Sequence, residues 1–310
     1  MQGWMIAFIV IAGVVLALAT AFLIGALVAV KKILGRRTTP SGESPEKYGV
    51  DIGWFDALAE LTETVEIKSY DGLTLRALLL RQPDNGTHAK VAVCQHGYGA
   101  TPRSMQPQAK IFYERGYNVL LPAARAHANS EGKYIGMAWL DRFDLLRWID
   151  KAVSIFGATA SIALAGTSMG GATVIAAAGM SLPPQVKCVV DDCGFSSQRE
   201  EYAANIERVK LPVSLKLLPL AVGVRLVLGY SISDADIVPL AKAMRVPALF
   251  IHGEKDTYVP FALGKKLYDA CGSADKQFYA VAEASHAMAY AVEPEKYTET
   301  FGAFIDKYVK

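Results

Sequence analysis

The segment Gly166-Thr167-Ser168-Met169-Gly170 has the pattern G-x-S-x-G and lies between an apolar, strand-like run and a helix-like run. A serine at a sharp turn between a strand and a helix exposes its hydroxyl group, and the small glycines let the two elements approach each other. The N-terminus of the helix also stabilises negative charge that develops beside it. The pattern therefore predicts Ser168 as the nucleophile of an acyl-transfer reaction.

A serine nucleophile needs a base, and the chain contains five histidines. His286 follows the last strand-like run, within Glu283–Ala287, where a loop can reach back over the serine. We therefore predict that His286 is the base. Of the other four, His88 is interpreted as a solvated residue of a polar turn. His96 and His252 are interpreted as braces of loops at strand ends, and His127 as a loop residue that could line the site.

The acid of such a site orients the imidazole and stabilises its protonated form. Asp256 lies just past the strand-like run that precedes the last one, which in a parallel sheet puts it beside His286. We predict Asp256 as this acid. Asp191 and Asp192 follow another strand-like run and are the alternatives.

Acyl transfer also needs N–H donors aimed at the oxyanion that develops. The backbone N–H of Met169, the residue after the serine, is one predicted donor. The second is predicted to be the backbone N–H of Tyr98, in the loop His96–Gly99 after an earlier strand-like run. The Tyr98 hydroxyl is either an extra donor or part of the wall of the site.

The elements that position these residues alternate along the chain. A hairpin is expected where Thr64–Tyr70 and Leu73–Leu80 flank Asp71-Gly72. Further strands are expected at Lys90–Gln95, Tyr117–Pro122, Ser161–Gly166, Val186–Val190, Ala248–Ile251 and Lys276–Val281. Helices are expected at Phe55–Leu61, Met105–Arg115, Leu140–Phe156, Met169–Met180, Phe261–Ala270 and Glu295–Tyr308. This order predicts an α/β fold with a mostly parallel eight-stranded sheet, helices on both faces, and the site at the carboxyl ends of the strands.

The N-terminal segment differs in composition from the rest. Residues 1–30 contain no Asp, Glu, Lys or Arg, and Trp4–Val30 as a helix would be roughly 40 Å long. Because this exceeds the ~30 Å hydrocarbon core of a bilayer, the segment is predicted to be a transmembrane anchor. A cleaved signal peptide is the alternative, since Ala17-Leu18-Ala19 suits a peptidase. The missing basic n-region and the length of the apolar run favour the anchor.

The charges after the apolar run predict the orientation. Lys31, Lys32, Arg36 and Arg37 follow it, so the positive-inside rule puts the catalytic domain of a single-pass membrane protein on the cytoplasmic side. The exported side is the alternative. The expected organisation is an anchor at 1–30, a basic juxtamembrane segment and linker at 31–60 and a catalytic domain at 61–310. The turn-rich stretch Thr38–Pro45 lies in this linker.

Composition excludes several classes of protein. The 310 residues are 52% hydrophobic with a mean hydropathy of +0.23, which excludes a disordered chain. With Lys+Arg 32 against Asp+Glu 30, no nucleic-acid partner is expected. At least three of the four cysteines lie in strand-like or pre-helical apolar runs and are interpreted as buried thiols. Because the chain has no H-E-x-x-H, no C-x-x-C pair and no P-loop, neither a metal nor another cofactor is expected.

Together these motifs resemble the α/β-hydrolase superfamily. The resemblance runs from about Val65 to Lys310 and is closest to bacterial membrane-anchored or exported members of the serine aminopeptidase-like (Hydrolase_4) branch. It implies the triad Ser168, Asp256 and His286, which follows the chain order of that superfamily, with Tyr98 and Met169 at the oxyanion. One departure is R-A-H-A at 125–128, where relatives have R-x-H-G, and this puts the local pocket shape in doubt. The matching pieces are HGYGATP, RAHANSEGKYIG, GTSMGG, HGEKDTYVP and EASHA.

The resemblance also implies a cap after the sixth strand, where the alternation breaks at about 195–237. Glu200–Lys210 is polar and helical in pattern, and Leu211–Gly229 is apolar and interrupted by Pro212 and Pro219. The apolar part is interpreted in three ways. It lines an acyl pocket, it packs on the main domain, or it touches the bilayer near the anchor.

These observations predict a serine hydrolase that cleaves small carboxylic esters through an acyl-enzyme, with membrane lipid contacted by the anchor. Two alternatives remain. An aminopeptidase or dipeptidyl-peptidase would need an acidic group for the substrate amine, for which Glu200 and Glu201 are candidates. A membrane-tethered binding module without catalytic activity would have kept only the fold.

Overall fold

The computed structural model describes residues 3–37, 52–84, 88–206 and 211–310. The predicted linker stretch Thr38–Pro45 lies outside these residues. In the described part, eight strands form one mixed sheet with the order β1-β2-β4-β3-β5-β6-β7-β8. The strands are β1 (Thr62–Lys68), β2 (Thr74–Leu80), β3 (Lys90–Gln95), β4 (Tyr117–Pro122), β5 (Ser161–Thr167), β6 (Val186–Asp192), β7 (Ala248–Gly253) and β8 (Lys276–Val281).

The sheet is antiparallel at one edge and parallel elsewhere, which confirms the predicted fold class. β1 and β2 form the expected hairpin, and β2 pairs antiparallel with β4. From β4 to β8 every pair is parallel. The buried middle strands read as continuous apolar runs because both faces of the sheet are covered.

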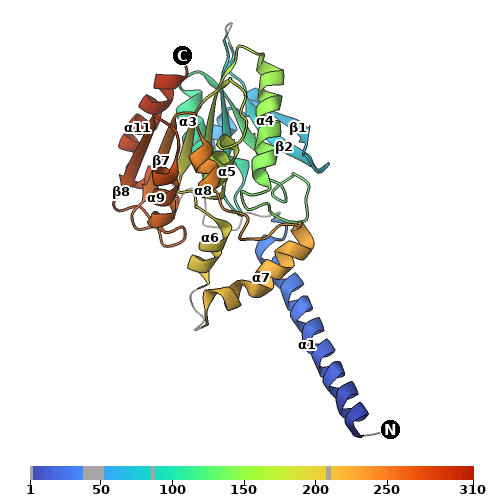
Figure 1. Ribbon diagram of the computed structural model, residues 1–310. Helices are drawn as coiled ribbons and strands as arrows, with labels where there is room; N and C mark the ends of the chain where they lie inside the picture. The colour runs from blue at the N-terminus through green and yellow to red at the C-terminus, as the bar shows by residue number, and fades with distance from the viewer. Residues whose placement is uncertain (1–2, 38–51, 85–87, 207–210) are drawn as a thin grey trace.

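Helices cover both faces of the sheet (Figure 1). One face packs against α3 (Gln106–Tyr113) and α11 (Pro294–Tyr308) around a core that contains Phe112, Phe301 and Phe304. The other face packs against α4 (Asp141–Phe156), α5 (Met169–Ala178), α8 (Val238–Ala243) and α9 (Phe261–Ala270). The short elements are α2 (Ile52–Ala57), the 3-10 turns Ala59–Leu61 and Pro102–Met105, and α10 (Ala289–Val292).

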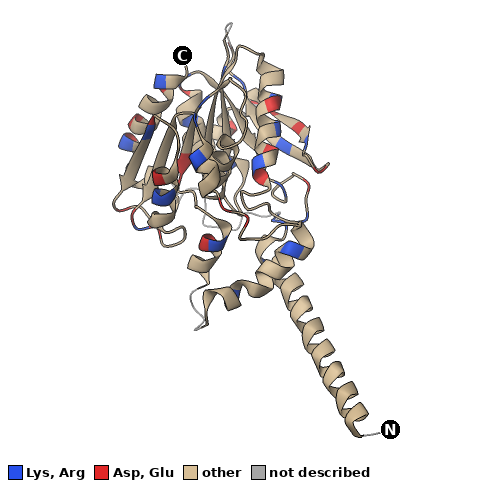
Figure 2. Cartoon of the chain, in the orientation of Figure 1, with Lys and Arg blue, Asp and Glu red and all other residues tan. Residues whose placement is uncertain are grey.

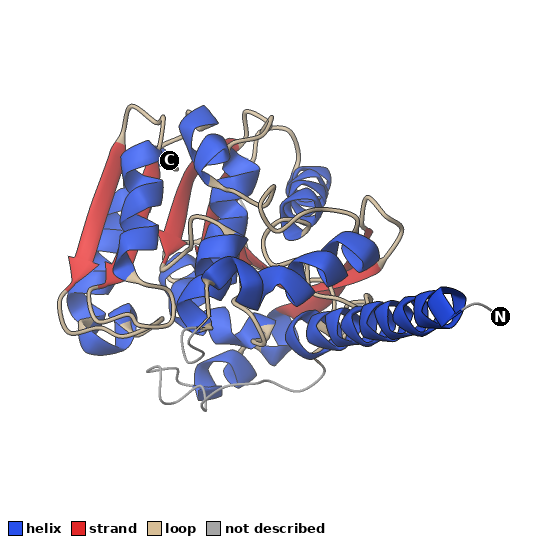
Figure 3. Ribbon diagram, turned by 60° about the horizontal axis from the view of Figure 1, so that its bottom comes forward, coloured by secondary structure: helices blue, strands red, loops and turns tan. Residues whose placement is uncertain are grey.

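Helix α1 (Gly3–Leu34) projects away from this domain (Figure 3). Among the described residues it is the one helix long and apolar enough to cross a membrane, with a mean hydropathy of 2.8 over its best window, none of which is buried. Only its C-terminal part contacts the domain, through the buried side chains of Ala26, Val30 and Leu34. The helix continues through the basic residues Lys31 and Lys32 into the predicted juxtamembrane segment.

The residues after α1 pair with the domain. Gly35 forms an antiparallel bridge with Tyr134, and Arg37 forms a parallel bridge with His127. The Arg36 guanidinium donates to the carbonyl oxygens of Ser130 (2.6 Å) and Ala128 (2.8 Å). The end of α1 is therefore fixed to the loop that follows β4.

The insertion after β6 forms two further helices at the lower side of the domain in Figure 1. They are α6 (Gln198–Asn205) and α7 (Val213–Leu228). The side chain of Ser197 caps α6 by accepting a hydrogen bond from the Glu200 N–H. Pro219 lies inside α7, which ends at Gly229 in the left-handed conformation.

Candidate active site

Ser168 lies between β5 and α5 in a strained conformation. Its φ of 57° and ψ of −118° lie in a region that residues other than glycine rarely occupy. The flanking glycines make this turn possible. A Cβ on Gly166 would lie 2.2 Å from the carbonyl oxygen of Gly170, and a Cβ on Gly170 would lie 1.9 Å from that of Gln95. The turn therefore presents the hydroxyl of Ser168 at the carboxyl edge of the sheet.

His286 joins Ser168 to Asp256. Its Nε2 lies 2.9 Å from the Ser168 Oγ, and its Nδ1 lies 2.7 Å from the Asp256 Oδ2. Because an ionised carboxylate only accepts hydrogen bonds, the proton belongs on Nδ1, which leaves Nε2 free to accept from the serine hydroxyl. The structure thus brings together three residues that are up to 118 positions apart in the chain.

Asp256 is held in its ionised form by several donors. Its Oδ1 accepts the backbone N–H groups of Tyr258 (2.9 Å) and Val259 (2.8 Å). Burial by itself would raise the pKa of this carboxyl group, but hydrogen bonds from His252, His286 and the backbone lower it to about 2. Asp256 is therefore ionised throughout the neutral pH range and can stabilise a positive charge on His286.

The alternative acids have other partners. The Asp191 Oδ1 accepts the backbone N–H of Gly194 at 2.9 Å. The Asp192 Oδ2 accepts the Tyr297 hydroxyl at 2.8 Å and the Gln108 amide at 3.3 Å. Asp191 thus fixes the segment after β6, and Asp192 links the end of β6 to α3 and α11. His286 hydrogen-bonds to Asp256 instead.

The loop His96–Gly99 after β3 lies beside the serine. A Cβ on Gly97 would lie 3.4 Å from the Ser168 Cβ. The His96 Nδ1 donates to the Gly97 carbonyl (2.8 Å), and the His127 Nε2 accepts the Gly99 N–H (3.0 Å). Burial lowers the pKa of His96 to about 3, so the ring is neutral. The two histidines therefore brace the loop, and His127, which from the sequence could line the site, is fully buried.

On the other side of the turn, the N–H of Met169 opens α5. The first N–H groups of a helix have no partner within the helix, so this one is available beside Ser168. The N–H groups predicted to bind an oxyanion, those of Tyr98 and Met169, thus belong to two segments that flank the serine.

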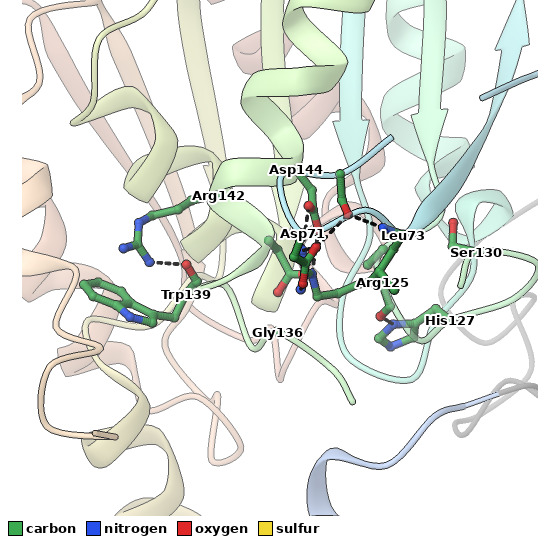
Figure 4. A network of polar contacts seen from close by, with 12 residues as sticks. Asp71, Leu73, Arg125, His127, Ser130, Gly136, Trp139, Arg142 and Asp144 are labelled. Atoms are coloured by element: carbon green, nitrogen blue, oxygen red, sulfur yellow. Dashed lines mark hydrogen bonds and ion pairs between the residues drawn. The ribbon is translucent and has the colours of Figure 1, made fainter. Parts of the chain in front are cut away.

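A buried ion-pair network holds the loop that carries His127 (Figure 4). The Arg125 guanidinium donates to Asp144 at 2.6 and 2.7 Å and to Asp71 at 2.9 and 3.1 Å. Arg125 and Asp144 are almost fully buried, whereas Asp71 is partly exposed. Because two N–H groups face each carboxylate, the guanidinium fixes the start of this loop in one geometry.

The hydroxyl of Tyr98 contacts the end of α1. It accepts a hydrogen bond of 2.7 Å from the Arg37 guanidinium and donates to the carbonyl oxygen of Ile33. The Arg37 guanidinium also lies 5.4 Å from the centre of the Tyr98 ring. The hydroxyl is therefore engaged by the N-terminal segment, an arrangement that neither interpretation from the sequence included.

One residue of the cap and one of the loop after β7 lie near Asp256 and His286. The ring of Tyr258 lies 4.9 Å from the ring of His286. Glu201 of α6 is 2% exposed, and burial together with the charge of Asp256 raises its pKa to about 8. Its Oε1 accepts the Asn205 amide, and its Oε2 has no hydrogen-bond partner in the described part of the chain. Sequence patterns do not reveal this burial, because a Glu in a polar helix is usually solvated.

Cys193, Asp256 and His286 place potential metal-ligand atoms within 4.8 Å of one another. Burial raises the pKa of the Cys193 thiol, which disfavours the thiolate that a metal site needs. A metal there would also take His286 away from Asp256 and Ser168. The arrangement therefore suits proton transfer better than metal binding. All four cysteines are buried free thiols, whereas the sequence predicted this for at least three.

The chain is similar in sequence to several known proteins. Residues 204–294 match the serine aminopeptidase (S33) family, and residues 68–225 match the X-Pro dipeptidyl-peptidase (S15) family. The uncharacterized protein YqkD of Bacillus subtilis is 27% identical over 70% of this chain and 70% of its own. The putative esterase YitV of the same organism is 26% identical over 57% of this chain and 72% of its own.

The fold is also that of a solved esterase. The structure of the Pyrococcus furiosus esterase Pf2001 superposes with a TM-score of 0.68 at 20% identity, over 90% of this chain and 99% of its own. The S15 match covers just over half of the chain, residues 68–225. Family match and fold together show that the chain belongs to the α/β-hydrolase superfamily of serine hydrolases.

Proposed function

We propose that this protein hydrolyses carboxylic esters with Ser168 as nucleophile, His286 as general base and Asp256 as the group that orients His286. The observation that carries the proposal is the pair of hydrogen bonds at the two nitrogens of His286, 2.9 Å to Ser168 and 2.7 Å to Asp256. This is the arrangement that a proton relay from a serine hydroxyl needs.

In the proposed reaction, the His286 Nε2 takes the proton of Ser168 while the serine oxygen attacks the ester carbonyl carbon. The N–H groups of Met169 and Tyr98 donate to the resulting oxyanion, each contributing ~10²–10³ in rate. His286 then protonates the departing alcohol, which leaves an acyl group on Ser168. Water, deprotonated by His286, attacks this acyl group and releases the acid.

We also propose that α1 anchors the enzyme in a membrane, with the catalytic domain on the cytoplasmic side. The length and composition of α1 support a membrane span, and the basic residues Lys31 and Lys32 at its C-terminal end support this orientation. Protease digestion of intact cells and of inverted membrane vesicles tests the orientation. The domain should be digested in inverted vesicles only, and digestion in intact cells would contradict it.

An ester panel tests the activity. The full chain in detergent is assayed with p-nitrophenyl esters of increasing acyl length. Ser168→Ala is the test variant, and Ser154→Ala, at an exposed serine of α4, is the matched control. We expect hydrolysis by the wild type and by the control, and its loss in Ser168→Ala. Equal hydrolysis by all three proteins would refute the assignment.

One observation favours a peptidase as the second candidate. The Oε2 of the buried Glu201 has no hydrogen-bond partner among the described residues, and a substrate amine bound there would supply the cation that this carboxyl group lacks. Glu200, in contrast, already pairs with Lys266 at 2.7 Å. A peptidase would cleave aminoacyl-anilides faster than esters and would lose this activity in Glu201→Gln but not in Glu200→Gln. An esterase would show the opposite substrate preference.

A further inference from the structure

The cap helix α7 is apolar on two sides. One side, with Leu217, Leu220 and Val224, is buried. On another side Leu215, Leu218 and Leu226 are 56%, 44% and 60% exposed. Their spacing of three and eight residues puts them on one stripe of the helix. The side of a helix opposite its buried side is normally polar, so an exposed apolar stripe there marks a surface for a further contact.

α7 crosses α1 in close contact near the domain (Figure 1). A Cβ on Gly223 of α7 would lie 2.5 Å from the carbonyl oxygen of Ala26 and 2.5 Å from the Cγ2 of Val30, both on α1. The two helices therefore touch nearly backbone to backbone. This contact fixes α7 at one level along α1.

That level coincides with the expected membrane surface. The part of α1 before Ala26 has no buried residue, and its residues 3–25 extend roughly 34 Å at ~1.5 Å per residue. This length matches the ~30 Å hydrocarbon core of a bilayer. If α1 spans the membrane, the surface of the bilayer falls where α7 crosses.

The charges around the crossing are of one sign. Lys31 and Lys32 of α1 and Arg225 of α7 are exposed, and Lys216 of α7 is partly exposed. Neither helix contains an Asp or Glu, and Figure 2 shows no acidic band on either. A cationic rim beside an apolar stripe is the pattern of a helix that lies in the surface of an anionic bilayer.

We propose that α7 is a second membrane contact, which lies in the surface of an anionic lipid bilayer with its exposed leucines among the acyl chains. Lys216 and Arg225 would contact the anionic headgroups. The proposal rests on the proposed membrane anchor α1. It implies that the cap of the proposed ester hydrolase sits on the lipid surface.

Lipid quenching tests the contact in the full chain. Single cysteines at Leu218, Leu16 and Glu299 are labelled with the fluorophore NBD and reconstituted into nanodiscs of phosphatidylcholine and phosphatidylglycerol with brominated acyl chains. The same measurement on the protein without an added cysteine corrects for labelling of the buried native cysteines. Leu16 of α1 reports on the anchor, and Glu299 of α11 is an exposed reference on the domain.

We expect quenching at Leu16→Cys and Leu218→Cys and none at Glu299→Cys. In Leu218→Cys, the added pair Lys216→Gln and Arg225→Gln should lower the quenching at least about twofold in anionic nanodiscs. Quenching at position 16 but not at 218 would overturn the proposal while the anchor stands. Absence of quenching at both positions would overturn the anchor and the proposal together. Blue-shifted but unquenched fluorescence at 218 would assign the stripe to a second copy of the chain and would also overturn it.

Discussion

Arg37, three positions after the end of α1, donates a hydrogen bond of 2.7 Å to the hydroxyl of Tyr98, which is 61 positions away in the chain. Tyr98 donates in turn to the carbonyl oxygen of Ile33 at the end of α1. The loop that flanks Ser168 is thus tied to the apolar N-terminal helix. The segment 33–37 thus connects α1 to the loop beside Ser168.

The first prediction concerns this tie. Tyr98→Phe removes both hydrogen bonds of the hydroxyl but keeps the ring, so the loop loses its attachment to Arg37. We expect kcat to fall ~10-fold, which corresponds to about 1.4 kcal/mol, with little change in KM. Steady-state kinetics on a p-nitrophenyl ester measure this, with the remote Tyr113→Phe as control. An unchanged kcat would show that the tie does not position the loop.

The second prediction concerns the acid. Asp256→Asn should lower kcat by up to ~10⁴-fold, because the amide no longer fixes the His286 tautomer that accepts the serine proton. Asp192→Asn should lower it far less, because the Asp192 carboxylate hydrogen-bonds to Tyr297 and Gln108. Comparison of the two variants in one ester assay checks this. A larger loss of kcat in Asp192→Asn would show that the acid lies at the end of β6 and not after β7.

The third prediction concerns stability. Arg125→Met leaves the buried Asp144 without its cation, and we expect the free energy of unfolding to fall by ~3–5 kcal/mol. Arg81→Met breaks a pair whose side chains are 40% and 47% exposed, and should cost at most ~1 kcal/mol. Denaturant unfolding of the full chain in detergent measures both. Equal losses of unfolding free energy in the two variants would show that the buried network contributes no more to stability than the exposed pair.

The fourth prediction concerns acid pH. Burial lowers the pKa of His127 to about 4, below the ~6.5 of an exposed histidine. As the pH falls below 6.5, the unfolded chain takes up a proton at this ring and the folded chain does not. The contribution of the neutral ring to the free energy of unfolding is therefore largest above pH 6.5. It falls by ~1.4 kcal/mol per pH unit as the pH drops towards 4.

Because other buried acids titrate in the same range, the test is a difference between two proteins. Unfolding free energies of the wild type and His127→Gln are measured from pH 7 to pH 5. The wild type should lose stability relative to the variant as the pH falls. A difference that stays constant with pH would show that the His127 ring is not held neutral.

Much of the fold was predictable because its signals are local. The runs Lys90–Gln95, Tyr117–Pro122 and Lys276–Val281 are apolar strands bounded by turns, and the structure has strands with the same bounds. The turn at Ser168 has a local signature as well, since its glycines are required by contacts with nearby backbone. Helix ends differ by a few residues where the caps are weak, as at α3 and α5.

The contacts between distant segments were not predictable. Nothing near Arg37 in the sequence points to Tyr98, because their contact depends on where the end of α1 meets the loop after β4. The burial of Glu201 likewise follows from the packing of α6 over the site. The bracing of Gly99 by His127 joins two loops 28 positions apart, and a single sequence carries no signal for such a pair.

Labelling with a fluorophosphonate probe tests the central claim most directly, because the probe reacts with a serine only when a neighbouring base activates its hydroxyl. The full-length wild type should be labelled at Ser168, as mass spectrometry of the modified peptide would show. Labelling should be absent in Ser168→Ala and strongly reduced in His286→Gln, with Ser154→Ala unaffected. A wild type that stays unlabelled, or undiminished labelling in His286→Gln, would contradict activation of Ser168 by His286.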